Sequence, residues 1–123
     1  ENMESRLQQG QPVKRDLNAS RLQMMMSFIH SHYADQISLA DIANFAHVSN
    51  NGCMQIFKNG IRQSPVSYLI QYRLKKAAEL LANTEMKVAV ISEECGFHDV
   101  PYFYRKFKEI YGISPIEYRK SNL

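Results

Sequence analysis

The sequence has no tryptophan, only two cysteines and only four prolines among its 123 residues. Cys53 and Cys95 lie far apart and form no C-x-x-C pattern. A disulfide framework and a zinc site are therefore not indicated, and we expect two buried free thiols. The apolar runs fall well short of the ~20 residues that a membrane helix needs, and the first thirty residues lack a signal-peptide core. These absences predict a cytoplasmic protein.

Acidic residues are missing from the whole segment between Ile42 and Ala78. The net charge of +3 and the pI near 8.9 are mild, so the placement of the charges matters more than their sum. Five cations fall in this segment, namely Lys58, Arg62, Arg73, Lys75 and Lys76. This bias suits a surface that faces phosphate groups and releases counterions, and it equally suits a solvated basic face. Charge alone leaves both interpretations open.

Motifs for catalysis are also missing. The sequence has no glycine-rich phosphate loop, no nucleophile motif and no carboxylate pair with an obvious pocket. His30 and His32 are two residues apart, so on a helix they point to different faces and do not share a metal ion easily. We therefore expect no enzyme activity, no metal and no cofactor.

The apolar residues that are present follow a helical period nearly everywhere, which predicts an all-α fold. Ser64 followed by Pro65 is a helix start, and Ser114 with Glu117 forms a capping box. The methionines of the first helix are expected to pack in a core rather than to line a ligand pocket. Seven helices are expected, over about 19–34, 39–47, 50–58, 64–83, 87–95, 99–111 and 115 onwards.

An internal repeat organises these helices. Phe57, Lys58, Ser64, Pro65 and Tyr68 recur fifty residues later as Phe107, Lys108, Ser114, Pro115 and Tyr118. Upstream of the turn the offset is 49, which a one-residue difference within a turn explains. Each copy places a short helix, a tight connection and a second helix in order, which is the helix-turn-helix arrangement.

The helix expected over 64–83 joins the two copies. At ~1.5 Å per residue it would be ~30 Å long, and the major groove of B-DNA returns to the same face every ~34 Å. Such a helix could hold two recognition helices in successive major-groove windows, so the sequence predicts sequence-specific binding of double-stranded DNA. Duplicated packing without DNA binding is the alternative explanation of the repeat.

The second copy resembles the AraC/XylS family of bacterial transcription regulators. The residues that match the family pattern lie within ISEECGFHDVPYFYRKFKEIYGISPIEYR; they are Ile91, Gly96, Phe97, Asp99, Tyr102, Phe103, Arg105, Phe107, Lys108, Gly112, Ser114, Pro115, Tyr118 and Arg119. The resemblance extends from about Ala19 to Arg119 and implies a DNA-binding domain of seven helices, the third and sixth of which enter the major groove. It also implies an absent N-terminal sensor or receiver domain. The expected division is 1–18 as a linker from that domain, 19–63 and 84–123 as helix-turn-helix subdomains, and 64–83 as the linker helix.

The resemblance also suggests which residues contact DNA. They are Asn51, Met54, Gln55 and Lys58 in the first recognition helix, and Val100, Pro101, Tyr104, Arg105 and Lys108 in the second. Arg105 can pair with guanine and Gln55 with adenine, each worth ~1–3 kcal/mol when it reads a base. The two lysines suit phosphate contacts, which fix register without reading sequence.

This sequence departs from the family pattern mainly in its first copy. Cys53, Met54 and Gln55 replace a usual Leu-Ser-Arg, so an arginine is missing. Arg62 occupies a turn position where glycine is common, and Gly60 is a candidate for its role. In the second copy Pro101 replaces a usual serine. We therefore expect the first unit mainly to grip the DNA backbone while the second reads bases.

A helical protein-interaction module, for example one that contacts RNA polymerase, is the alternative from another class of function. Family members commonly touch the polymerase, so this role is compatible with DNA binding. The domain itself is expected to be a monomer, while the full-length protein could be a dimer.

Overall fold

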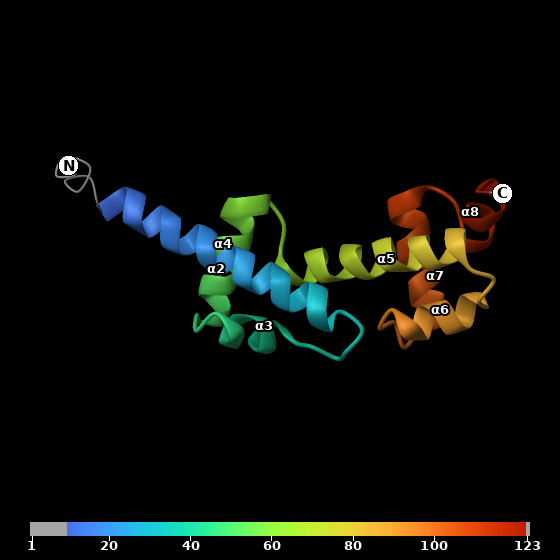
Figure 1. Cartoon of the computed structure of the whole chain (residues 1–123), viewed down its shortest axis with the longest axis horizontal. Coiled ribbons are helices and arrows are strands. Elements are labelled where there is room, and N and C mark those ends of the chain that lie inside the picture. Colours follow the sequence, from blue (N-terminus) through green and yellow to red (C-terminus); the bar gives the residue numbers. More distant parts are fainter. Residues whose placement is uncertain (1–9, 123) are drawn as a thin grey trace. The chain divides into compact units, whose positions relative to one another are not determined.

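The computed structural model describes residues 10–122, with side chains from Leu17 onwards. Within this part of the chain there are seven α-helices and no strand (Figure 1), which confirms the all-α prediction. The helices are α2 (Gly10–His32), α3 (Leu39–Phe45), α4 (Asn50–Ile61), α5 (Pro65–Asn83), α6 (Val88–Glu94), α7 (Val100–Tyr111) and α8 (Pro115–Ser121). No helix in this range is long and apolar enough to cross a membrane.

The first helix differs from its expected bounds at both ends. α2 extends from Gly10 rather than from near Ala19, and Pro12 is compatible with this, because in a first turn its missing N–H leaves no helical bond unmade. Residues 10–18 of the expected linker are thus helical, and residues 1–9 lie outside the described part. At the other end α2 stops at His32. Tyr33, which falls within the expected helix over 19–34, packs instead against the buried cluster that contains Leu74 and Phe103.

The chain divides into two compact units. Among the described residues, unit 1 contains those up to Ser31 together with Ser38–Pro65, and unit 2 contains His32–Ile37 together with those from Val66 onwards. The long helix α5 therefore belongs, apart from its first residue, to unit 2. Its buried stripe explains why, since Leu74, Ala77 and Leu81 all lie in the core of that unit.

The core of unit 1 is built by three helices. The stripe of α2 buries Met25 and Ile29 completely, which confirms a packing role for that part of the methionine run. The other buried apolar side chains come from α3, α4 and the turn between them: Ile42, Ala43, Ala46, Cys53, Ile56 and Phe57. This core holds α3 and α4 together as the first helix-turn-helix.

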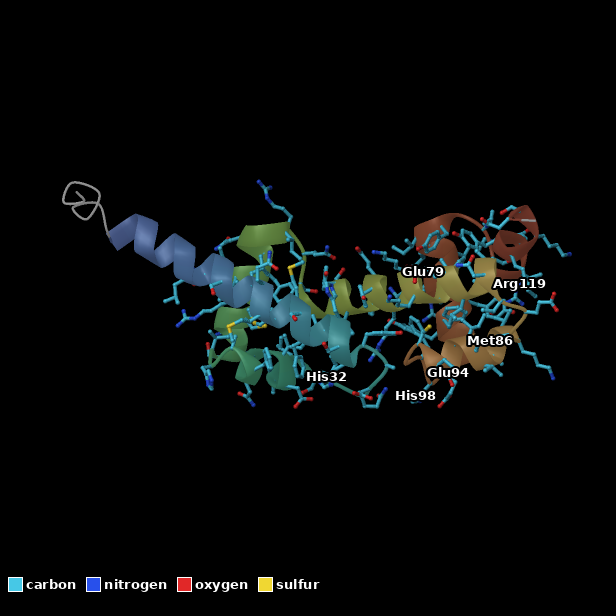
Figure 2. The ribbon with its side chains drawn as sticks, in the orientation of Figure 1. His32, Glu79, Met86, Glu94, His98 and Arg119 are labelled. Carbon is cyan, nitrogen blue, oxygen red and sulfur yellow. The ribbon has the colours of Figure 1, made fainter. Side chains whose placement is uncertain are left out.

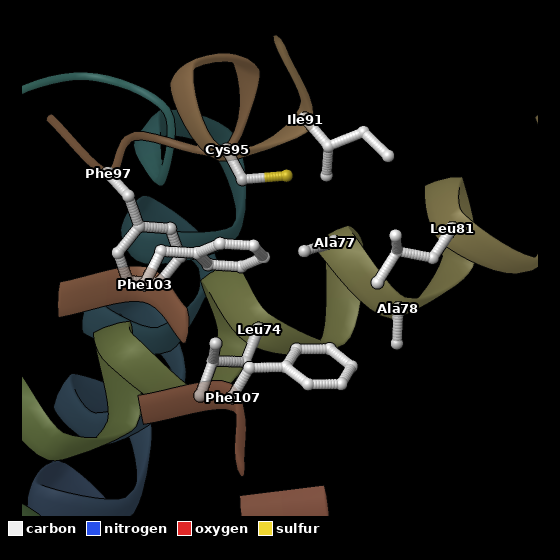
Figure 3. Close-up of a cluster of buried hydrophobic side chains, with 9 residues drawn as sticks. All are labelled: Leu74, Ala77, Ala78, Leu81, Ile91, Cys95, Phe97, Phe103 and Phe107. Carbon is white, nitrogen blue, oxygen red and sulfur yellow. The ribbon is translucent and has the colours of Figure 1, made fainter. Parts of the chain in front are cut away.

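The core of unit 2 is richer in aromatic side chains (Figure 3). Phe97, Phe103 and Phe107 are buried, and the rings of Phe97 and Phe103 lie 5.0 Å apart. The cluster also contains Leu74, Ala77, Ala78, Leu81, Ile91 and Cys95. Since the phenylalanines come from α7 and the turn before it, the buried side of α7 is fixed and its other side faces outwards.

Both cysteines are buried and free, as expected. Burial raises the pKa of the Cys53 thiol to about 11. The pKa of Cys95 is also raised to about 11, mainly by burial and further by the nearby carboxylates of Glu94 and Glu79. A thiol with such a pKa is almost entirely protonated at neutral pH and is a poor nucleophile.

Candidate nucleic-acid interface

The second helix of unit 1, α4, is fixed by its cap and by its buried side. Ser49 caps the helix, and its hydroxyl accepts a 3.0 Å hydrogen bond from the N–H of Gly52. Cys53, Ile56 and Phe57 point into the core. These contacts determine which side of α4 is presented to a ligand.

The four residues that were predicted to contact DNA from α4 lie together on that side. Asn51, Met54, Gln55 and Lys58 are all exposed. With ~100° of rotation per residue, their positions span an arc of ~100° on the helix. The surface offers an amide pair, a thioether and one ammonium group, and α4 contains no acidic residue.

The second helix of unit 2, α7, has the same construction. Asp99 caps it, and one carboxylate oxygen accepts a 3.2 Å hydrogen bond from the N–H of Tyr102. Phe103 and Phe107 are its buried residues. Because these two correspond to Cys53 and Phe57 at an offset of fifty, both helices turn the same register positions inwards.

The predicted contact residues of α7 are also brought to one side, with different exposure. Pro101, Arg105 and Lys108 are exposed, whereas Val100 and Tyr104 are half-buried. The ring of Tyr104 lies edge-on to Phe103, with 6.1 Å between the ring centroids. Packing therefore explains why Tyr104 is half-buried. Arg105 and Lys108 supply the positive charge of this surface.

Arg105 is supported by a neighbouring aromatic ring. Its guanidinium carbon lies 5.2 Å from the centroid of the Tyr102 ring, within the range of a cation–π contact. Tyr102 is in turn 6.3 Å from Phe97, centroid to centroid. Since Arg105 is also exposed, its N–H groups stay able to pair with a base or a phosphate.

The basic segment between Ile42 and Ala78 separates into structural and free charges. Arg73 is half-buried; its Nε donates a 2.6 Å hydrogen bond to the carbonyl of Tyr33, and its Nη2 donates one of 2.8 Å to the carbonyl of Asp35. Burial lowers the pKa of Arg73. Lys76 lies 3.6 Å from the carboxylate of Glu79 (labelled in Figure 2). Lys58 is the exposed cation among the predicted contacts of this segment.

Three of the differences between the turns of the two units concern an extra residue or a left-handed backbone. His98, labelled in Figure 2, is the extra residue in the turn of unit 2, and its Nδ1 lies 3.8 Å from a carboxylate oxygen of Glu93. His47 occupies a left-handed conformation, with φ of 58°, at the position where unit 2 has Gly96. Arg62 does the same, with φ of 62°, where unit 2 has Gly112.

Gly60 does not compensate for Arg62, and this expectation was wrong. Gly60 lies inside α4 and has no positive φ. A Cβ there would collide with the end of the Leu22 side chain on α2, which would have to move, so Gly60 lies where α4 approaches α2. Arg62 itself adopts the left-handed conformation and ends the helix.

Arg62 is also the residue near the interface that the sequence reasoning did not include among the contacts. A hollow of about 350 Å³ in unit 1 is lined by Met54, Gln55, Lys58, Arg62, Gln63 and Ser64. Three of these six residues are predicted DNA contacts. The offset of fifty that aligns Arg62 with Gly112 was the signal that could have drawn attention to it.

Between residues 10 and 122, no three histidine, cysteine, aspartate or glutamate side chains are grouped so that they could hold a metal ion. The two exposed surfaces offer amides, cations and aromatic edges instead, which are the groups that contact bases and phosphates.

Comparison with known proteins gives matching results. A family model described as a helix-turn-helix domain matches residues 42–121. An uncharacterized HTH-type transcriptional regulator of Bacillus subtilis, YdeC, is 33% identical over 106 residues, which is 86% of this chain and 36% of that protein. The chain spans about a third of the length of the curated relatives it matches.

Two solved structures show the same fold. A transcriptional regulator from Chromobacterium violaceum, described as AraC-type, is 27% identical with a TM-score of 0.81, over 85% of this chain and 93% of that one. The DNA-binding domain of the transcriptional factor AdpA, solved in complex with a target DNA, is 24% identical with a TM-score of 0.77, over 81% of this chain and 90% of that one. The chain belongs to the AraC-type helix-turn-helix family of transcription regulators and carries the DNA-binding domain of that family.

Proposed function

We propose that this domain recognises an asymmetric site on double-stranded DNA through α4 and α7, each of which enters the major groove. The observation that carries the proposal is that each helix buries one side in the core of its own unit and exposes most of the predicted contact residues together on the other: all four on α4, and Pro101, Arg105 and Lys108 on α7. The AdpA domain, which has the same fold, was solved on its target DNA.

We propose further that the two helices occupy successive major-groove windows of one duplex. α5 is a continuous helix of 19 residues, or ~28 Å at ~1.5 Å per residue. This length is close to the ~34 Å repeat of the groove. One chain would then supply two DNA-contacting helices. The domain would act as a monomer in the bacterial cytoplasm even where the full-length protein is a dimer.

The two helices would divide the work. Arg105 has a guanidinium that can pair with guanine, whereas Gln55 stands at the corresponding position of α4. Lys58 and Lys108 occupy equivalent places and suit phosphate contacts. Unit 2 would therefore read bases and unit 1 mainly grip the backbone.

Selection from a random duplex pool tests the proposal. The protein is mixed with the pool at two salt concentrations, and the bound fraction is sequenced. Enrichment of one asymmetric site, with two blocks about one helical turn apart, is the expected result. Strongly salt-dependent binding without enrichment would mean non-specific grip only. Absence of binding would favour the protein-interaction module, with RNA polymerase as the first partner to examine.

The division of work is tested with the selected site and a set of single-base variants of it. Arg105→Ala should lose discrimination at one or two base pairs, by ~1–3 kcal/mol. Gln55→Ala should change discrimination much less. Equal losses of specificity in the two variants would refute the division.

A further inference from the structure

Arg62 occupies a backbone conformation that favours glycine. It ends α4 with φ of 62° and ψ of 30°, and its N–H donates to the carbonyl of Lys58. Gly112 ends α7 in the same way, with φ of 82° and its N–H bonded to Lys108. The left-handed region disfavours any side chain with a Cβ, so unit 1 accepts strain that unit 2 avoids at the same position.

Packing does not explain the arginine. The side chain of Arg62 is exposed and makes no hydrogen bond or ion pair with any residue of the described chain. A Cβ added at Gly112 would meet nothing within 4 Å, so the equivalent turn has no cavity that a larger residue must fill. Backbone strain that no packing or hydrogen bond of the side chain compensates is a reason to look for a functional role of the residue.

The surroundings of Arg62 indicate what that function is. Arg62 and Lys58 line the same hollow of about 350 Å³, and no acidic residue lines it. The hollow continues the exposed surface of α4, since Met54 and Gln55 also line it. Two cations at the edge of a groove-reading helix match the charge of a DNA strand beside the major groove.

We propose that Arg62, together with Lys58, grips a backbone phosphate of the DNA that α4 enters. This inference rests on the proposed DNA binding and adds to it a contact that unit 2 cannot make, since glycine stands at the equivalent place. A guanidinium can bind two phosphate oxygens with parallel hydrogen bonds. Unit 2 has Arg105 at the position where α4 has the neutral Gln55. Arg62 thereby gives unit 1 a positive charge that α4 lacks at that position, and this charge adds affinity for the DNA backbone.

Arg62→Gly is an informative test because it separates binding from stability. Glycine suits the left-handed backbone, so the variant should unfold at the same temperature as the parent chain or higher. Its affinity for duplex DNA should fall about five- to tenfold, by a similar factor for the selected site and for unrelated duplexes. The slope of log K against log salt should decrease by ~0.9, the value for one phosphate contact. Arg62→Lys should keep most of the slope because it keeps the charge.

Lys106→Gln is the matched control. Lys106 lies on α7 outside the predicted contact surface, and its ammonium is 3.3 Å from the carboxylate of Glu109. Its loss should leave the salt slope unchanged. An Arg62→Gly variant with the parent's affinity and slope would overturn the inference, and so would a loss confined to the selected site, because that would indicate base reading. If the parent chain bound no duplex even at low salt, the proposed function would fail and this inference with it.

Discussion

Gly96 is a position where one added methyl group should have a large and separable effect. The residue is buried in the turn before α7, with φ of 96°, so alanine there would be strained whatever the space. The space is also closed. A Cβ would lie 2.7 Å from the carbonyl oxygen of Tyr33 and 2.8 Å from Nε of Arg73, the two atoms joined by the 2.6 Å hydrogen bond that fixes the Tyr33 segment.

The cost of Gly96→Ala has two parts. The left-handed conformation of a residue with a Cβ costs ~1–2 kcal/mol. Displacing Arg73 from its carbonyl partners loses a hydrogen bond of a charged donor, which contributes ~1.5–3 kcal/mol. The free energy of unfolding should therefore fall by roughly 3–5 kcal/mol. A small domain has only ~5–15 kcal/mol in total, so such a loss is easy to measure.

Gly112→Ala is the matched comparison. Gly112 also has a positive φ, of 82°, but an added Cβ would meet nothing within 4 Å. This variant should lose only the ~1–2 kcal/mol of backbone strain. Both variants are unfolded in urea and followed by circular dichroism. Equal losses of stability would refute the argument, because they would show that the contact with Tyr33 and Arg73 contributes nothing.

Two further predictions concern ionisable groups. The Glu117 carboxylate accepts a 2.9 Å hydrogen bond from the N–H of Ser114, which lowers its pKa below the usual 4.5. The stability it contributes is complete above the unfolded pKa and is lost as the pH falls through the folded pKa. The drop in Tm between about pH 5 and 3 should therefore be smaller in Glu117→Gln, and an unchanged drop would exclude this carboxylate as a cause. Cys53 and Cys95, with pKa values of about 11, should react slowly with a thiol reagent at pH 8 in the folded protein and rapidly in urea. Immediate reaction of one thiol equivalent before urea is added would contradict their burial.

The helices were predictable because local signals agree with one another. The capping box of Ser114 and Glu117 and the apolar period of each segment locate the elements without tertiary information. The end of α2 was not predictable in this way. Tyr33 continues the helical period in sequence, yet its carbonyl is held by Arg73, forty residues away, and the chain leaves the helix before it. No local pattern carries information about such a distant partner.

The predicted contact residues lie on one side of each helix because they share a register, and register follows from the helical period. That they contact DNA remains a prediction. The structure of Arg73 and Arg62 could not be predicted from that period. Both are cations in a segment without acids, but Arg73 is half-buried and bonded to carbonyls while Arg62 is exposed. A count of charges treats the two arginines alike. Only their hydrogen-bond partners in the folded chain distinguish the structural Arg73 from the free Arg62.

The two copies of the repeat share some buried positions and differ at several exposed ones, and the exposed differences bear on the kind of DNA that the domain can recognise. Phe57 and Phe107 are both fully buried at equivalent positions. At the exposed positions Gln55 corresponds to Arg105, and the turn residue Arg62 corresponds to Gly112. An amide and a guanidinium pair with different bases. Since unit 2 is proposed to read bases while unit 1 mainly grips the backbone, the base sequence should be constrained more strictly in the block that contacts α7 than in the block that contacts α4, and the target should be asymmetric.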